Sequence, residues 1–198
     1  MKVIGLTGNI ASGKSSVSKI LKGLGAYIID ADIVAREVTK KGEVAWMRIK
    51  EHFGKQYIAV DGEIDRKRLG ELVFSSPGAL GELNAIVHPI IVKRINDKLK
   101  RLKEEDIYEV VVIDAALLIE TGCHDIVDEI WVVTLPKDMQ IDRLIKRDRL
   151  TKKQATDRIE SQMPQSEKIK LADRVIDNSK ELSHTKEQVY CMWNEIMH

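Results

Sequence analysis

The segment from Gly8 to Ser15 fits the phosphate-binding pattern G-x-x-x-x-G-K-[ST]. In this pattern the glycines let the backbone wrap an anion, and successive N–H groups and the N-terminus of the next helix point at a β-phosphate. Lys14 adds a mobile positive charge, and the Ser15 hydroxyl suits Mg²⁺. A strand-like run precedes the pattern and an amphipathic stretch follows it, which favours a true phosphate site over a chance glycine-rich turn. The residues expected to bind ATP here are Gly8, Ala11, Ser12, Gly13, Lys14, Ser15 and Ser16.

A pair of acids, Asp30 and Asp32, follows the second strand-like run, Tyr27 to Ile29. Open α/β sheets bind their ligands at the carboxyl ends of such strands. A carboxylate there can accept the proton of an attacking hydroxyl during phosphoryl transfer, so Asp32 is the predicted catalytic base. The alternative is that Asp32 caps a helix that begins near Ile33, and the two roles are compatible.

A third acid, Asp114, ends the apolar run Val110 to Ile113. An apolar strand that ends in Asp is typical of the carboxylate that supports Mg²⁺, directly or through water, in nucleotide-binding proteins. Strands also end in Asp because this residue suits turns. Beside a phosphate-binding loop the metal interpretation is favoured, so Ser15 and Asp114 are the predicted Mg²⁺ residues.

Two arginines, Arg143 and Arg147, lie four residues apart on a helix expected after Pro136. They point away from its apolar face, and two guanidinium groups on one side suit triphosphate oxygens. Such a helix could form a lid that closes over ATP, excludes water and adds positive charge to the transition state. The alternative is an ordinary solvated face.

Short β-rich runs alternate with helix-periodic segments, which predicts an α/β fold of the P-loop kinase type, a parallel β-sheet flanked by helices. We expect a single domain over 1–198, with an inserted helical substrate region at about 33–106 and a helical lid at about 136–172. Pro89 is expected to end one helix of the insertion and start another. The expected strands are Val3 to Leu6, Tyr27 to Ile29, Glu109 to Ile113, Glu129 to Thr134 and Arg174 to Ile176.

The composition excludes several classes of protein. The 198 residues carry a formal net charge of +1, without the excess of basic residues typical of nucleic-acid binding. No run is long and apolar enough for a membrane span or a signal peptide, so we expect a cytoplasmic protein. Cys123 and Cys191 lie far apart, outside any metal-ligand spacing, and are interpreted as ordinary thiols.

The order of these motifs resembles the dephospho-coenzyme A kinase family, and the resemblance spans almost the whole chain. The phosphate-binding loop by itself is shared by many families, whereas the Asp-Ala-Asp turn, the His-Pro step and the Leu-Leu-x-Glu segment are specific to this one. The matching segments are Ile4-Gly5-Leu6-Thr7-Gly8, Asp30-Ala31-Asp32, Ala35-Arg36-Glu37, His88-Pro89, Asp114 with Leu117-Leu118-Ile119-Glu120, Arg143, Arg147-Asp148, Arg158 with Gln162, Ala172-Asp173 and Val175-Ile176-Asp177-Asn178.

The resemblance implies a nucleotide-binding core, a helical region for dephospho-coenzyme A, and a lid. It implies that Asp32 is the base for the ribose 3′-hydroxyl, that Arg143 contacts phosphate and that Asn178 lies against adenine. Thr7, Arg36 and His88 would surround the substrate, although a His before Pro89 could equally mark a helix boundary. The chain departs from the family pattern at Ala11, Ala116, Ile119 and Lys180, none of which is a reactive group.

The predicted function is therefore transfer of the γ-phosphate of ATP to the 3′-hydroxyl of dephospho-coenzyme A, with Mg²⁺ as cofactor. A switch GTPase is disfavoured because the chain has no N-K-x-D motif. Another small P-loop kinase, acting on a nucleoside, a nucleotide or a sugar acid, is the alternative enzyme. A nucleotide-sensing protein without transfer activity is the alternative outside enzymes. The sequence does not indicate an oligomeric state.

Overall fold

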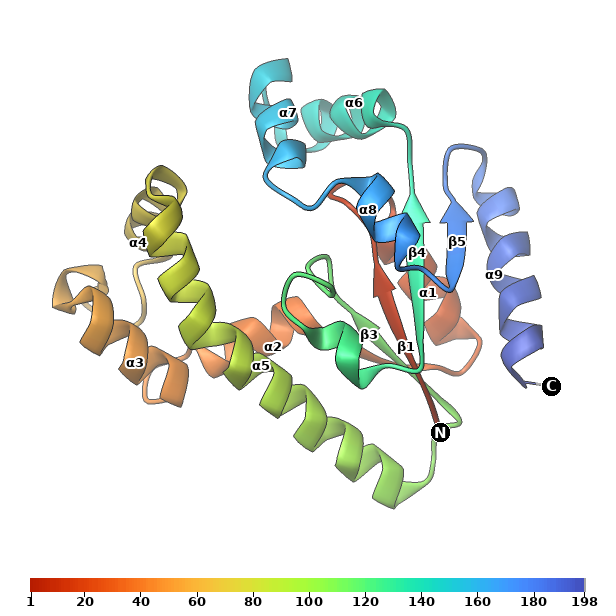
Figure 1. Ribbon diagram of the computed structural model, residues 1–198, viewed down its shortest axis with the longest axis horizontal. Helices are drawn as coiled ribbons and strands as arrows, with labels where there is room; N and C mark the ends of the chain where they lie inside the picture. The colour runs from red at the N-terminus through yellow and green to blue at the C-terminus, as the bar shows by residue number, and fades with distance from the viewer. Residues whose placement is uncertain (198) are drawn as a thin grey trace. The chain divides into compact units, whose positions relative to one another are not determined.

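The computed structural model describes residues 1–197, with the side chains of residues 74 and 77 excepted. The chain forms two compact units. The first contains residues 1–29 together with the chain from 102 onward, and the second contains residues 30–101. Figure 1 labels the helices and strands of both units.

A five-stranded sheet is the centre of the first unit, and its strand order is β2-β3-β1-β4-β5. The pairs β1 with β3, β1 with β4, and β4 with β5 are parallel. Each predicted strand is present within one residue at either end, and the predicted fold class is confirmed. The strands are β1 Lys2–Thr7, β2 Tyr27–Asp30, β3 Val110–Asp114, β4 Glu129–Thr134 and β5 Arg174–Asp177.

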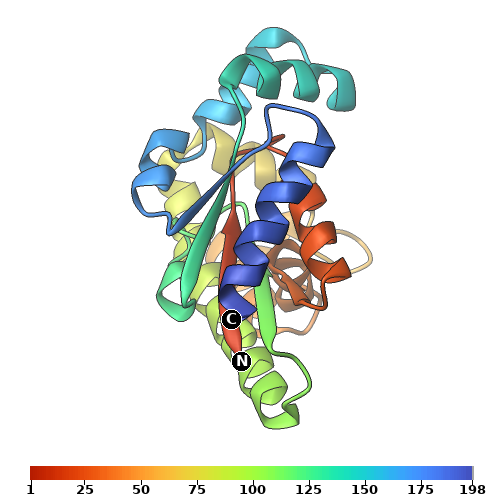
Figure 2. The same cartoon turned by 90° about the vertical axis from the view of Figure 1, so that its right-hand side faces the viewer.

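Two helices, α1 Lys14–Gly23 and α9 Leu182–Met197, lie side by side over one face of this sheet (Figure 2). Strand β3 is buried along its whole length, as its unbroken apolar run indicates. The core beneath the two helices is built from apolar side chains of both layers. Its fully buried members include Ile4, Leu6, Val17, Leu21, Trp131, Ile176 and Val189.

The segment predicted to be the lid, called the lid below, contains α6 Lys137–Asp148, α7 Lys152–Glu160 and α8 Gln165–Lys170, which follow β4 at the carboxyl end of the sheet (Figure 1). Thr151 and Gln154 form a reciprocal capping box that starts α7. The lid has its own apolar cluster, against which Ile10 and Ala11 of the phosphate-binding loop pack. Its buried members are Ile141, Leu144, Ala155 and Ile159. The phosphate-binding loop is therefore in direct apolar contact with the lid.

The second unit is helical. It contains α2 Ala31–Val38, α3 Val44–Phe53, the 3-10 turn η1 Lys55–Tyr57, α4 Arg66–Ser75 and most of α5 Pro77–Glu105. A further 3-10 turn, η2 Cys123–Ile126, belongs to the first unit. A separate apolar cluster holds α3, α4 and the start of α5 together. Its buried members are Ile49, Phe53, Ile64, Leu69 and Val73.

The prediction that Pro89 separates two helices is wrong, because α5 continues through it as one helix. Proline in a helix interior lacks the N–H that would bond to the preceding turn and costs about 3 kcal/mol. Burial on both sides of Pro89 offsets this cost. Val87 packs against the cluster of the second unit, while Ile91 and Ile95 are buried further along. Tertiary packing of the apolar stripe therefore overrides the local signal.

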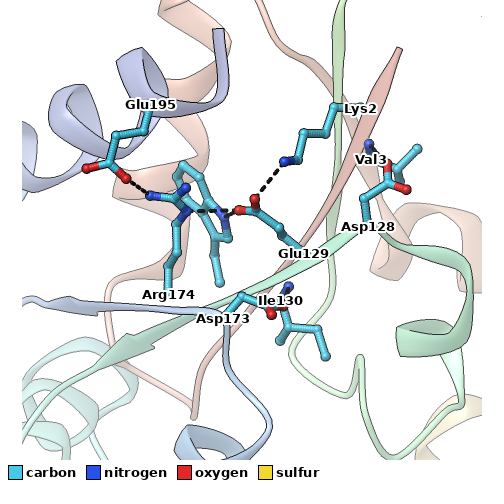
Figure 3. A network of polar contacts seen from close by, with 9 residues as sticks. Lys2, Val3, Asp128, Glu129, Ile130, Asp173, Arg174 and Glu195 are labelled. Atoms are coloured by element: carbon cyan, nitrogen blue, oxygen red, sulfur yellow. Dashed lines mark hydrogen bonds and ion pairs between the residues drawn. The ribbon is translucent and has the colours of Figure 1, made fainter. Parts of the chain in front are cut away.

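A polar network ties the amino ends of three strands together (Figure 3). The Glu129 carboxylate accepts from Lys2 Nζ at 2.6 Å, and from Arg174 Nε and Trp131 Nε1 at 2.9 Å each. Arg174 also pairs with Glu195 of α9. Burial alone would raise the pKa of Glu129, but these hydrogen bonds lower it to about 2. The network therefore stabilises the amino ends of the strands, at the end of the sheet opposite the phosphate-binding loop.

Within residues 1–197, no helix combines the length and the apolar composition that a membrane crossing requires.

Candidate active site

An ion pair between Lys14 and Asp114 lies at the mouth of the phosphate-binding loop. It forms because β1 and β3 are neighbours, with Leu6 in register with Asp114 and the loop beginning two residues after Leu6. The two side chains are only 18% and 10% exposed. The structure thus brings together the predicted phosphate-binding lysine and the predicted metal-supporting carboxylate.

Two glycines of the loop are required by close contacts. A Cβ on Gly8 would lie 2.6 Å from the Val133 carbonyl oxygen, and a Cβ on Gly13 would overlap the Asn178 side-chain amide. Gly13 also has a φ of 96°, in the left-handed region that favours glycine, and it forms the N-cap of α1. The backbone can therefore take the tight path that a phosphate-binding loop needs.

Ala11 departs from the family pattern and also has a left-handed backbone, with a φ of 64°. For a residue with a Cβ, this conformation is less favourable than the right-handed one by roughly 1–2 kcal/mol. The Ala11 side chain packs against the apolar cluster of the lid, which offsets part of that cost. The departure therefore keeps the loop conformation and adds a contact to the lid.

Arg143 lies over the same loop. Its guanidinium donates to the carbonyl oxygens of Ala11 and Asn178 at 3.3 Å each, and to that of Ser12 at 3.5 Å. The Asn178 amide donates to the Ser12 carbonyl at 2.7 Å, and its oxygen accepts from Thr185 at 2.8 Å. The lid arginine and the loop after β5 thus meet on the phosphate-binding loop.

Arg147 is arranged differently from Arg143. Its guanidinium forms two hydrogen bonds to Asp148, at 2.8 and 3.0 Å, and its side chain is 59% exposed. The hydrogen bond from Arg147 lowers the pKa of Asp148, and Arg158 bonds to the same carboxylate at 3.2 Å. Arg147 therefore lies on the outside of the lid, and its predicted role in ATP binding stays a prediction.

The two acids at the end of β2, Asp30 and Asp32, have distinct positions at the start of the second unit. Asp30 is the N-cap of α2, and its Oδ1 accepts from the amides of Asp32 and Ile33 at 2.8 and 3.0 Å. The interpretation of Asp32 as the cap is therefore wrong, because the helix begins one residue earlier than Asp32. Asp32 lies in the exposed first turn, where its carboxylate forms no hydrogen bond or ion pair within the described part of the chain.

The predicted substrate residues lie on three elements. Thr7 is fully buried, and its hydroxyl donates to the Ala116 carbonyl at 3.2 Å. Arg36 is exposed on α2. His88 is half-buried within α5, so the interpretation of it as a helix-boundary residue is wrong. Burial lowers the pKa of His88, which keeps its imidazole neutral at pH 7.

The side chains predicted to hold Mg²⁺ carry the oxygen donors that this ion prefers. Ser15 is exposed in the first turn of α1, next to Lys14, and Asp114 ends β3 beside the loop. Both belong to the first unit, and the donor set of one hydroxyl and one carboxylate leaves room for phosphate oxygens and water. The residues present therefore fit Mg²⁺.

Sequence reasoning missed several residues that support the loop. Gln162 Oε1 accepts from the Ile10 amide at 2.7 Å, and the Asn9 side chain donates to the Met163 carbonyl at 3.1 Å. Gln162 belonged to the family pattern, but nothing in the pattern assigned it a partner. Lys168, which is fully buried, had no signal at all, because a lysine in a short charged helix normally faces solvent.

The strand order and the phosphate-binding loop, with the Lys14–Asp114 ion pair beside it and Arg143 bonded to its backbone, are those of the P-loop kinase class. The comparisons with known proteins narrow this class. The family model described as dephospho-CoA kinase matches residues 2–184, and the chain belongs to this family.

Individual relatives agree with this assignment. A dephospho-CoA kinase from Carboxydothermus hydrogenoformans is 46% identical over 189 residues, which cover 96% of this chain and 91% of the relative. The crystal structure of TT1252 from Thermus thermophilus has a TM-score of 0.84 at 30% identity, covering 100% of this chain and 98% of that one. A dephospho-CoA kinase structure from Campylobacter jejuni has a TM-score of 0.73 at 29% identity, covering 99% and 98%.

Proposed function

We propose that this enzyme transfers the γ-phosphate of ATP to the ribose 3′-hydroxyl of dephospho-coenzyme A and releases coenzyme A and ADP. The observation that carries the proposal is the convergence of Lys14, Asp114 and Arg143 on the phosphate-binding loop in a chain of this family. These groups hold and neutralise phosphate, which is most of what phosphoryl transfer asks of a protein. A cytoplasmic location, expected from the sequence, stays a prediction.

The phosphate-binding loop supplies the positions for ATP. The backbone amides that begin α1 bind the β-phosphate, and Lys14 moves from Asp114 to phosphate oxygens when ATP arrives. Arg143 exchanges backbone carbonyls for phosphate oxygens and stabilises the charge that develops in the transition state. Ser12 and Ser16 extend the loop contacts, Arg147 adds positive charge at the lid, and Asn178 lies against adenine.

The transfer itself moves one phosphoryl group and one proton. The 3′-oxygen of the acceptor forms a bond to the γ-phosphorus while the bond from that phosphorus to the β,γ-bridging oxygen breaks, so ADP leaves. Asp32 accepts the proton of the 3′-hydroxyl. Thr7, Arg36 and His88 are proposed to contact the acceptor, the last as a neutral imidazole.

A Mg²⁺ ion held by Ser15 and Asp114 would neutralise charge on the β- and γ-phosphates.

The local structure supports Asp32 as the base. Asp30 already fills the capping position of α2, so the Asp32 carboxylate is not required there. It is exposed, so it is free to reach a substrate hydroxyl. The same observation argues against Asp30 as a substitute base, because its Oδ1 accepts from two backbone amides.

The proposal is tested by incubating the protein with ATP, Mg²⁺ and dephospho-coenzyme A and identifying the products by mass. We expect one ADP for each coenzyme A, with phosphate on the 3′-oxygen. A panel of nucleosides, nucleotides and sugar acids tests the alternative acceptors. Faster transfer to one of these, or phosphate at another position, would contradict the proposal.

The role of Asp32 is tested by Asp32→Asn. Loss of a general base lowers kcat by roughly 10²- to 10⁴-fold, while ATP binding and Tm stay close to wild type. Asp97→Asn is the matched control, since Asp97 is a partly exposed acid of the same unit that pairs with Lys93. Activity of Asp32→Asn within a few-fold of wild type would remove Asp32 from the reaction.

A further inference from the structure

Lys168 in α8 is a fully buried lysine of the first unit, with a relative exposure of 0%. Its ammonium donates to the Ala116 carbonyl at 2.7 Å and pairs with Glu120 Oε1 at 2.9 Å. A buried charge is costly unless it is paired and hydrogen-bonded, and an apolar side chain of the same size would fill this space without that cost. The Lys168 charge is therefore better explained by the groups that it positions than by a contribution to the stability of the fold.

Both partners of Lys168 belong to the loop that follows β3 and Asp114. The Ala115 amide extends the pairing of β3 with β1 through a bond to the Leu6 carbonyl at 3.0 Å. The next carbonyl, that of Ala116, accepts from Lys168 and from the Thr7 hydroxyl at 3.2 Å. The Lys168 ammonium and the Thr7 hydroxyl thus hold the same carbonyl, two residues after Asp114, and Thr7 directly precedes Gly8.

Glu120 extends the same contacts to the lid. Its Oε1 accepts from the Met163 amide at 3.3 Å, in the segment that joins α7 to α8. The Met163 carbonyl in turn accepts from the Asn9 side chain at 3.1 Å. The lid connection and the phosphate-binding loop are therefore linked through Glu120, whose charge is balanced by Lys168.

We propose that Lys168 is a positioning residue for phosphoryl transfer, because its ammonium holds the loop after β3 against the end of β1 and the lid connection. It touches neither ATP nor the acceptor. It acts through Ala116 and Glu120, which set the placement of Asp114, Thr7 and the start of the phosphate-binding loop. Misplacement of reacting groups by about 1 Å can lower a rate by up to about 10²-fold, so this support affects kcat.

The test compares Lys168→Met with two controls. We expect kcat to fall by about 10- to 100-fold with the KM for ATP within about 3-fold of wild type. Lys170→Met removes an exposed lysine of the same helix, which pairs with Glu167, and should keep wild-type kcat. Val189→Ala removes buried methyl groups of α9 from the core of the same unit and should lower Tm. At temperatures below its melting transition, this variant should keep the kcat of wild type.

A double variant separates positioning from the cost of a buried charge. In Lys168→Met with Glu120→Gln no buried charge is left unpaired, so Tm should recover most of the loss seen in Lys168→Met. The Ala116 carbonyl still lacks its ammonium donor, so kcat should stay low. Recovery of kcat together with Tm would overturn the proposal, as would a kcat of Lys168→Met within about 3-fold of wild type.

Hydrogen exchange gives a readout that does not depend on the reaction. The kinetic test rests on the proposed function, whereas exchange measures the loop directly. In the double variant, amides of residues 7–12 and 115–122 should exchange about tenfold faster than in wild type, with α9 unchanged. Unchanged exchange in these segments would refute the positioning role, while a wild-type protein inactive on dephospho-coenzyme A would refute only the proposed function.

Discussion

The carboxylate of Glu129 is expected to contribute measurably to the stability of the first unit. Its pKa falls from 4.5 to about 2 on folding. This lowering of the pKa corresponds to roughly 3 kcal/mol of stability at neutral pH. The Glu129 side chain is 16% exposed, so solvent screening removes only part of this value. We expect Glu129→Gln to lower the free energy of unfolding at pH 7 by about 2 kcal/mol.

The pH dependence follows from the direction of the shift. A carboxyl group whose pKa is lower in the folded state stabilises the protein above its unfolded pKa and loses this contribution as pH falls. Wild type should therefore lose the Glu129 contribution between about pH 5 and about pH 2. The difference between wild type and Glu129→Gln should be largest at pH 7 and should shrink throughout that range.

Thermal or urea unfolding measures both effects. For a chain of this size, about 2 kcal/mol corresponds to a fall in Tm of roughly 4–8 °C. Glu195→Gln is the control, because Glu195 pairs with the same Arg174 but is 57% exposed and should matter much less. Equal Tm values for wild type and Glu129→Gln at pH 7 would refute the reasoning, and so would a difference that does not change with pH.

Three further outcomes concern the site. Lys14→Met should lower kcat by at least about 10²-fold, because the Lys14 ammonium stabilises phosphate charge in the transition state. Lys19→Met, on the exposed side of α1, should leave kcat unchanged. Equal rates for the two variants would show that Lys14 does not hold phosphate. Arg143→Ala should lower kcat more than Arg147→Ala, because only Arg143 lies over the loop, and coupled assays of both variants would reveal any reversal. Excess chelator should abolish transfer and added Mg²⁺ should restore it, whereas full turnover in chelator would contradict the roles of Ser15 and Asp114.

Elements with a strong local pattern could be predicted from the sequence. The five strands were found because β-rich runs alternate with helix-periodic segments and the runs are bounded by turn residues. The phosphate-binding loop was found because its chemistry restricts residue types at fixed spacing. Asp114 could be assigned to the phosphate site because an apolar strand ending in Asp is typical of nucleotide-binding proteins, and the structure places it beside Lys14.

What could not be predicted depends on competition between local and tertiary effects. Pro89 is a helix-breaking signal, and the helix continues because Val87 packs against the cluster of the second unit and Ile91 and Ile95 are buried. Whether Asp30 or Asp32 caps α2 depends on the exact residue at which the helix begins, and sequence patterns do not predict helix ends to that precision.

Networks of charged residues also could not be predicted from the sequence. Glu129 joins partners 127 and 45 residues away, and Lys168 reaches a carbonyl 52 residues away. Charged residues have no periodicity that indicates burial, so a buried lysine and an exposed one look alike in a sequence. The support of the site is therefore harder to predict than the site itself.

The ion pair of Lys14 with Asp114 has a consequence for how substrates arrive. Each group of the pair is already occupied by the other, so ATP without metal would have to leave Asp114 unpaired, and metal without ATP would have to displace Lys14. If Asp114 holds Mg²⁺ as proposed, nucleotide and metal bound together would replace this one ion pair by two, Lys14 with phosphate and Asp114 with Mg²⁺. We therefore expect nucleotide and metal to bind with positive cooperativity, which titration calorimetry of ATP with and without Mg²⁺ would measure.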